Sequence, residues 1–219
     1  TENEDLVRLA AEAGCRGLFV GLETFSEGNL QSMHKTCNQV DAYREAIQIL
    51  HKHGIGVEAG IVFGFDNDDS TVFTRTLAMI DDLQIDMAQI SIFTPLPGTP
   101  QWDIFQNRIF DRDWAHFDFH HCVFQPSKMS PKTLQEGHDW ITHEFYQPWR
   151  IARRLARQTT HPRLWKSLPV ALALNAAYFG RIYRWNIRGT NPATQWNKKE
   201  SQNAKRLNHP IPVVHNSSR

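Results

Sequence analysis

The chain has 219 residues, of which 41% are hydrophobic and 11% aromatic, and its formal net charge is +1. The apolar fraction excludes an intrinsically disordered protein, and three cysteines are too few for a disulfide-stabilised scaffold. No apolar run reaches the roughly 18 residues that a membrane-spanning helix needs. The acidic N-terminus does not resemble a secretory signal. We therefore expect a cytoplasmic protein that forms either one large domain or one domain with an extension.

Charge is distributed unevenly along the chain. Residues 1–146 carry 22 acidic and 10 basic residues, whereas residues 147–219 carry 14 basic residues and one acidic residue. Either the basic part packs on the acidic domain, or it binds an anionic partner such as a membrane surface. Residues 190–219 are rich in Asn, Lys, Ser and Pro, and we predict a disordered basic tail there.

Helices and strands are predicted to alternate in the first hundred residues. A capping-box pattern at Thr1 and Glu4 starts a helix that Gly14 ends. Short apolar runs typical of strands buried on both faces then follow at residues 17–23, 55–65 and 87–93. Amphipathic helices are predicted between them at residues 40–53 and 70–83. This alternation indicates repeated βα units and a parallel sheet.

The pattern changes after Pro100. Residues 102–124 are rich in aromatic residues and histidine and show no regular period. Ser130 and Pro131 are typical of a helix start. The inner face of that helix is predicted to consist of Leu134, His138, Ile141 and Phe145. Two basic helices are predicted to follow, at residues 149–158 and 167–185.

Three motifs at the ends of the predicted strands carry a family resemblance. They are Gly21-Leu-Glu-Thr24 with Lys35 behind it, Gly60-Ile-Val-Phe-Gly-Phe-Asp66, and Phe93-Thr-Pro-Leu-Pro-Gly-Thr-Pro100. In this order they resemble the second half of a radical S-adenosylmethionine (SAM) enzyme, and more narrowly the cobalamin-associated group that includes hopanoid-modifying enzymes. Motifs from Asp113-Trp114 to Glu144-Phe-Tyr146 resemble the C-terminal extension of that group.

The resemblance implies an α/β fold. Residues 1–100 would form the last three parallel strands of a partial (β/α) barrel, and residues 101–189 a mostly helical extension. The Cys-x3-Cys-x2-Cys loop that holds the family's [4Fe–4S] cluster is absent, because Cys15, Cys37 and Cys122 are separated by 21 and 84 residues. We therefore expect a C-terminal fragment that is inactive alone and self-associates through the unpaired edge of its first strand.

The resemblance also implies the chemistry. SAM would be cleaved reductively by the [4Fe–4S] cluster, and the resulting 5′-deoxyadenosyl radical would abstract hydrogen from an unactivated carbon. Cobalamin would carry a methyl group to that carbon. The chain would supply part of the SAM wall and a cap over a small-molecule or lipid substrate, with the N-terminal half of the enzyme as its partner. The resemblance is also compatible with binding of the protein to a membrane surface, whereas nucleic acid is not an expected partner.

Candidate cofactor-binding residues follow the strands, because ligands of parallel sheets bind at the carboxyl ends. Glu23 and Thr24 would bind the amino-acid or ribose part of SAM, or Glu23 would cap the following turn. Gly60 and Gly64 would let an adenine ring approach the backbone, or would let helix and strand pack. Ile61 and Val62 would form an apolar wall of the site. The loop of Phe93, Thr94 and Pro95 would frame the adenine through its backbone, or it would serve only as a rigid connector.

A histidine cluster is the main rival site. It comprises His116, His120, His121 and Cys122, whose side chains suit zinc although their spacing matches no standard finger. The cluster either belongs to a packed flap that shapes the substrate end of the barrel, or it binds a catalytic zinc ion. In the second case the protein would be a zinc-dependent hydrolase, which is one alternative function.

Two groups of charged residues each allow two interpretations. Asp66, Asp68 and Asp69 indicate a turn before a helix N-terminus in preference to a metal loop. An amphipathic basic helix either rests on anionic lipid or covers the acidic domain, and its basic residues are Arg150, Arg153, Arg154 and Arg157. A non-catalytic module that uses this basic region to contact a membrane or nucleic acid is the other alternative function.

Overall fold

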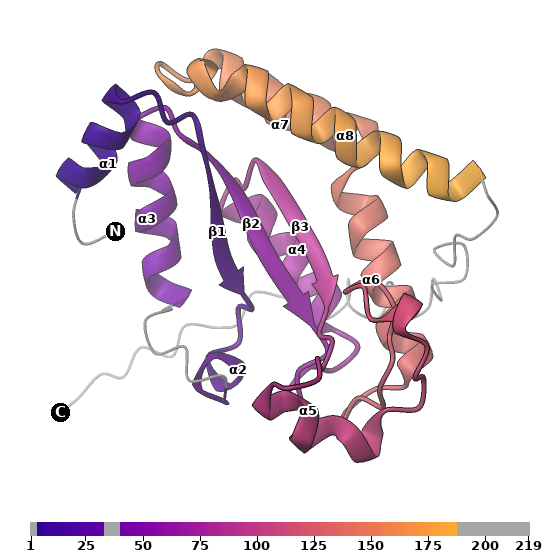
Figure 1. Ribbon diagram of the computed structural model, residues 1–219. Helices are drawn as coiled ribbons and strands as arrows, with labels where there is room; N and C mark the ends of the chain where they lie inside the picture. The colour runs from indigo at the N-terminus through magenta and orange to yellow at the C-terminus, as the bar shows by residue number, and fades with distance from the viewer. Residues whose placement is uncertain (1–3, 33–39, 188–219) are drawn as a thin grey trace, which may run out of the picture.

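A three-stranded parallel sheet forms the centre of the molecule. The computed structural model describes residues 4–32 and 40–187, so Thr1, Lys35, Cys37 and the predicted tail at 190–219 lie outside it. The strands are β1 (Gly17–Glu23), β2 (Gly56–Phe63) and β3 (Met87–Ile92), and they lie in the order β1-β2-β3 (Figure 1). The predicted parallel α/β architecture is confirmed. The described strands form an open sheet, not a closed barrel.

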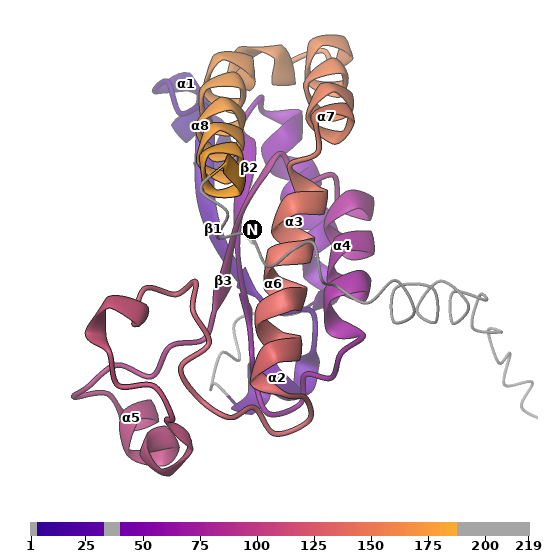
Figure 2. The same cartoon turned by 90° about the vertical axis from the view of Figure 1, so that its right-hand side faces the viewer.

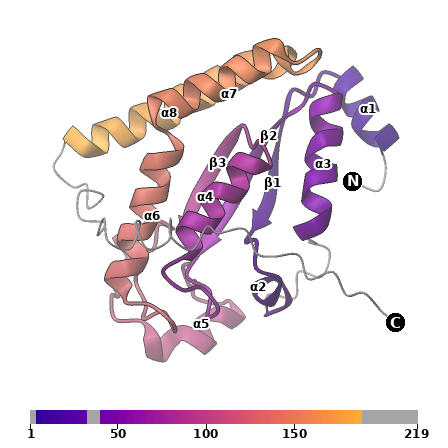
Figure 3. The same ribbon diagram turned by 180° about the vertical axis from the view of Figure 1, so that it is seen from behind.

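Four helices belong to the βα part of the chain. They are α1 (Glu4–Glu12), α2 (Glu27–Ser32), α3 (Val40–Lys52) and α4 (Val72–Asp82). Gly14 and Gly54 follow α1 and α3 with φ angles of +104° and +79°, which suits the residue that ends a helix in the left-handed region. The helices α3 and α4 lie on the same side of the sheet, as Figure 3 shows from behind.

The extension begins with α5 (Pro100–Phe105), a short helix in the region without sequence period, and continues through α6 (Pro131–Phe145), α7 (Pro148–Thr160) and α8 (Leu168–Ile187). The backbone N–H of Thr133 donates to the side chain of Ser130, so the predicted start of α6 is confirmed. In Figure 2, α6 runs beside α4, while α7 and α8 cross the end of the sheet where the strands begin.

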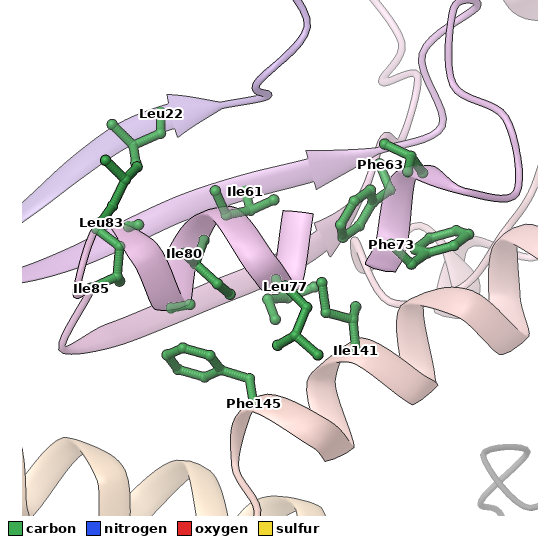
Figure 4. Close-up of a cluster of buried hydrophobic side chains, with 14 of the residues drawn as sticks. Leu22, Ile61, Phe63, Phe73, Leu77, Ile80, Leu83, Ile85, Ile141 and Phe145 are labelled. Atoms are coloured by element: carbon green, nitrogen blue, oxygen red, sulfur yellow. The ribbon is translucent and has the colours of Figure 1, made fainter. Parts of the chain in front are cut away.

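One hydrophobic core joins the sheet to α4 and α6. Phe63 of β2 packs against Phe73 of α4, with 4.8 Å between the ring centroids. The predicted inner faces are confirmed, because Phe73, Ile80, Ile141 and Phe145 are all completely buried (Figure 4). The extension is therefore part of the same packed core as the βα units.

The first strand departs from its prediction. Its apolar run suggested burial on both faces, but Phe19 and Leu18 are 58% and 40% exposed. β1 is the edge strand of the described sheet, so its side chains have neighbouring side chains along one flank only. Its neighbour β2 is the strand that is buried, with Val57, Ala59 and Ile61 facing the helices.

The two faces of the sheet differ in kind. Because side chains alternate along a strand, the face away from α3, α4 and α6 carries mostly small or polar residues. We call this the open face, and its members on β2 and β3 include Glu58, Gly60, Val62, Gln89 and Ser91. Helix α8 crosses the amino end of this face: its Val170 lies beside Gly17, and Ser167, which directly precedes the helix, lies beside Gly56.

The outer edge of β3 is sealed by the extension. The hydroxyl of Tyr146 donates to the carbonyl of Ala88 at 2.8 Å and accepts from the same residue's N–H at 3.2 Å. The Nε2 atom of His138 lies 3.2 Å from the carbonyl oxygen of Ile90. The N–H of Ile92 donates to the carbonyl of Phe119 at 2.7 Å. Side chains and backbone of the extension thus take the place of a further strand.

Replacing Tyr146 with phenylalanine tests this seal. The variant keeps the ring, which is buried and stacks on Tyr178, but leaves a buried N–H and carbonyl of Ala88 without their partner. We expect a loss of about 1–3 kcal/mol in the free energy of unfolding. Hydrogen exchange at the Ala88 amide should accelerate in parallel. An unchanged exchange rate at this amide would contradict the seal.

The arginines of the basic helix α7 contact the βα part of the chain and the end of α6. Arg150 and Arg153 form ion pairs with Asp81 at the end of α4, and Arg157 forms one with Asp86. Arg154 is buried and donates to the carbonyl of Phe145 at 2.8 Å. This arrangement favours the interpretation in which basic residues cover the acidic domain. Over residues 4–32 and 40–187, no helix has the length and hydropathy needed to cross a membrane.

Asp86 anchors the amino end of β3. Its side chain is fully buried and accepts hydrogen bonds from the N–H of Val57 at 2.9 Å and from Gln158 at 2.8 Å. It also pairs with His51 at 2.9 Å and with Arg157. Burial acts to raise the pKa of this carboxyl, but the hydrogen bond and charge of His51 and the charge of Arg157 lower it below its usual value. The network ties β2, β3, α3 and α7 together.

Candidate functional site

Two adjacent glycines form a floor on the open face near the carboxyl ends of the strands. Gly21 of β1 is paired with Gly60 of β2 in the sheet register. A Cβ atom on Gly60 would lie 2.8 Å from the ring of Phe19, and a Cβ atom on Gly21 would lie 2.7 Å from a carboxylate oxygen of Glu23. An aromatic ring and a carboxylate therefore lie directly over this floor.

The backbone at Glu23 has an uncommon conformation. Its φ angle is +65°, and the N–H of Thr24 donates to the carbonyl of Leu22 at 2.8 Å, which makes a three-residue γ-turn. The pairing with β2 shifts register at the same point. Positive φ is costly for a residue with a side chain and is concentrated at functional positions. The turn folds the Glu23 carboxylate back over Gly21.

The buried Thr24 takes part in the next turn. Its hydroxyl accepts a hydrogen bond from the N–H of Ser26 at 3.2 Å. Thr24 thus contributes a cap to this turn, and the alternative that Glu23 also caps it stays a prediction. A role for the Thr24 side chain at a ligand stays a prediction, and its position next to Glu23 fixes the end of β1.

The apolar wall belongs to Val62. Ile61 is 1% exposed and faces the helices, so its side chain is turned away from the open face, whereas the half-buried Val62 shares that face with Gly60. Gly64 has a φ of +104°, and a Cβ atom there would lie 3.0 Å from Leu134 and 3.1 Å from Phe124. The structure thus supports the packing interpretation for Gly64.

The acidic run after β2 forms a turn, as predicted. The carboxylate of the buried Asp68 accepts from the N–H groups of Gly64 at 2.9 Å and Phe65 at 3.1 Å, and from Asn29 at 2.7 Å. Burial raises the pKa of this carboxyl despite these bonds. Asp69 accepts from the backbone of Thr71 at 2.9 Å. The run therefore organises the loop before α4.

The loop after β3 is held by an aromatic cluster. The ring of Phe93 lies 5.0 Å from that of Phe105 and 5.8 Å from that of Phe124, measured between centroids. Thr94 is buried, and its hydroxyl donates to the carbonyl of Ile92 at 3.2 Å. Together with the buried Pro95, these contacts make the loop a firm connector. Framing of an adenine by its backbone stays a prediction.

The histidine cluster divides into separate contacts. His116 pairs with Asp111 at 2.7 Å, and His121 with Asp118 at 3.0 Å. The thiol of Cys122 donates to the carbonyl of Phe124 at 3.2 Å, and burial raises its pKa to about 11. In the part of the chain that the structure describes, no three His, Cys, Asp or Glu side chains are grouped to hold a metal ion.

Some site residues were missed by sequence reasoning. Phe19 covers Gly60, and the signal was available, because residues 19 and 21 alternate onto the same face of the strand. His120 was assigned to a possible zinc cluster, but its Nε2 lies 2.7 Å from Arg181 of α8. No sequence pattern indicates a contact between residues 61 positions apart.

The fold and these contacts define a class: an α/β protein of parallel βα units with two paired glycines near the carboxyl ends of its strands. No protein-family model matches the chain. It is 30% identical over 154 residues to bacteriochlorophyllide d C-12(1)-methyltransferase of Chlorobaculum tepidum, covering 70% of this chain and 34% of that protein. It is 32% identical over 102 residues to hopanoid C-2 methylase of Rhodopseudomonas palustris, covering 47% and 19%.

A third relative is the anaerobic magnesium-protoporphyrin IX monomethyl ester cyclase of Cereibacter sphaeroides, 26% identical over 155 residues, with 68% of this chain and 25% of that protein covered. The matches thus span about a third or less of these relatives' own length. They confirm the resemblance drawn from the strand-end motifs. The chain is homologous to the cobalamin-associated radical SAM methylases and cyclases.

Proposed function

We propose that this chain forms the SAM-facing wall and the substrate cap of a radical SAM enzyme that methylates or otherwise modifies a carbon atom of a lipid or tetrapyrrole. The glycine floor under Glu23 is the observation that carries the proposal. Relatives named for bacteriochlorophyllide, hopanoid and protoporphyrin substrates support the substrate class. For the whole enzyme, cobalamin is proposed as the carrier of the methyl group.

The residues over the floor fit SAM. Gly21 and Gly60 leave the backbone of two strands without side chains, and Val62 offers an apolar surface beside them. The Glu23 carboxylate is placed to accept charge-assisted hydrogen bonds from an ammonium group or a ribose diol. Phe19 lies over Gly60, so binding of an adenine at that glycine requires its exposed ring to move or to stack on the ligand.

The cysteines of this chain do not fit a [4Fe–4S] cluster. Cys15 precedes β1, where its thiol donates to the carbonyl of Gly17, whereas Cys122 lies in the extension with a protonated thiol. Three neighbouring thiolates are needed as ligands, and the cysteines of the sequence are separated by 21 and 84 intervening residues. When bound, SAM and the cluster supply the radical chemistry. The residues of this chain bind and orient SAM and exclude water from the open face.

Replacing Glu23 with glutamine tests the proposal. Glutamine keeps the size of the side chain but removes the charge that would hold an ammonium or a ribose. We expect the affinity of the full chain for SAM, measured by isothermal titration calorimetry, to fall by about tenfold.

Glu12→Gln is the matched control, because Glu12 is an exposed acid on α1 that pairs only locally with Arg8. It should leave the affinity for SAM unchanged. If Glu23→Gln binds SAM as tightly as the parent chain does, or if the parent chain shows no SAM binding at all, the SAM-wall assignment is wrong.

A further inference from the structure

A small cavity lies beside the sealed edge of β3, between this strand, α6 and α8. Its volume is about 110 Å³, and the side chains around it include Gln89, His120, Thr142, Tyr178 and Arg181. Gln89 is paired with Gly60 in the sheet register, so the cavity is next to the glycine floor, one strand away. A space of this size accommodates a few water molecules or one small functional group, and not a whole lipid or tetrapyrrole.

Two polar groups of the cavity, the Thr142 hydroxyl and the Arg181 guanidinium, can donate hydrogen bonds to a ligand. Among the described residues, the hydroxyl oxygen of Thr142 is buried and has no hydrogen-bond partner. Arg181 has no carboxylate within ion-pairing distance in that same part of the chain, and its guanidinium lies 2.7 Å from the Nε2 atom of His120. A guanidinium that donates to an imidazole nitrogen requires that nitrogen to be unprotonated. Burial, followed by the charges of His138 and Arg181, lowers the pKa of His120 to about 4, which agrees with this geometry.

The acidic residue facing this region is already engaged. Glu58, on the open face of β2, accepts a hydrogen bond from the hydroxyl of Tyr178 at 2.7 Å. The other nearby carboxylate, Asp139, contacts His138 at 3.0 Å and Gln135. Neither carboxylate is therefore paired with Arg181, whose positive charge faces the cavity without an anionic partner among the described residues. Part of the wall is apolar: it consists of Ala88, Ile90, Ile182 and the rings of Tyr146 and Tyr178, which stack with 5.0 Å between their centroids.

We propose that this cavity binds a carboxylate group of the substrate. The planar fork of Arg181 matches a carboxylate, and the hydroxyl of Thr142 adds a second donor. This inference deepens the proposed function, because it restricts the substrate to molecules that carry a carboxylate at one end and place their remainder along the open face toward Gly60. The aromatic walls fit the short aliphatic chain that joins such a carboxylate to a larger ring system.

The test uses butyrate and its neutral analogue butyramide as probes of the full chain, without SAM or cluster. Binding is followed by NMR at the methyl groups of Thr142 and Ile182. We expect butyrate to bind about tenfold more tightly than butyramide. In Arg181→Gln this preference should disappear, and in Thr142→Val the affinity for butyrate should fall a few-fold.

Two further variants keep the test decisive. Arg153 lies on α7 and pairs with Asp81 of α4. The variant Arg153→Gln should retain the full preference for butyrate. Arg181→Lys keeps the charge but loses the fork, and should retain a reduced preference. Equal binding of the two probes, or a preference that survives in Arg181→Gln, would overturn the carboxylate site. Because the experiment contains no SAM, it tests the carboxylate site even if the proposal that this chain binds SAM is wrong.

Discussion

Replacing Asp86 with alanine is expected to lower the free energy of unfolding by about 3–5 kcal/mol, the largest effect predicted for this chain. The substitution removes one carboxylate but leaves His51, Arg157, Gln158 and the N–H of Val57 facing its empty place. These donors lose their acceptor inside the protein, where water replaces it poorly. Urea denaturation followed by circular dichroism measures the change.

Asp82→Ala is the matched control. Asp82 pairs with Arg44 on the surface, and 58% of its side chain is exposed, so the substitution should cost at most about 1 kcal/mol. Similar losses in the two variants would show that Asp86 has no special role in holding the amino end of the sheet.

The same network predicts a pH dependence. The pKa of Asp86 is lower in the folded state than its usual value of 3.8, so the unfolded chain binds this proton more readily. The group therefore contributes its full stability above that value and loses it as the pH falls toward the folded pKa. Asp86→Asn should show a flatter loss of stability than the parent chain when the pH is lowered below about 4.

Gly137→Ala is expected to destabilise the protein by about 1–3 kcal/mol, even though alanine favours a helix more than glycine does. Gly137 lies within α6, and a Cβ atom there would lie 2.2 Å from the ring of Phe73, which is completely buried. Neither α4 nor α6 can move away without opening the core that they share with the sheet. Thermal unfolding of the variant measures the cost.

Gly180→Ala provides the opposite outcome in the same protein. Gly180 lies within α8, and a Cβ atom there would meet nothing within 4 Å. This variant should be stabilised by about 0.5–1 kcal/mol, because only the helix preference changes. If both glycine variants shift in the same direction, the close approach of α4 and α6 is not what constrains residue 137.

Local features were predictable from the sequence. The glycines at positions 14 and 54 end helices because φ > 0 costs glycine little, and Ser130 starts α6 because its side chain accepts from Thr133. The inner faces of α4 and α6 followed from spacing alone. The strand-end motifs indicated the family, because their order and spacing are set by the turn geometry of each βα unit.

Features that depend on distant partners were not predictable. The apolar run of β1 gives no sign that the strand lies at an edge, so the exposure of Phe19 came only with the sheet order. The basic residues of α7 have a charge pattern that suits either a lipid or an acidic surface, and only the positions of Asp81 and Asp86 select between them. The pairing of His120 with Arg181 likewise joins two elements that sequence spacing does not relate.

The seal on β3 makes the sheet extendable in one direction only. Tyr146, His138 and Phe119 occupy the backbone groups of β3, whereas β1 pairs only with β2 among the described strands and exposes Phe19. Among the described strands, β1 is therefore the edge at which we expect an added strand to pair. Two copies that join through β1 leave no free edge for a third, so self-association of this kind ends at a dimer and does not propagate into a fibre.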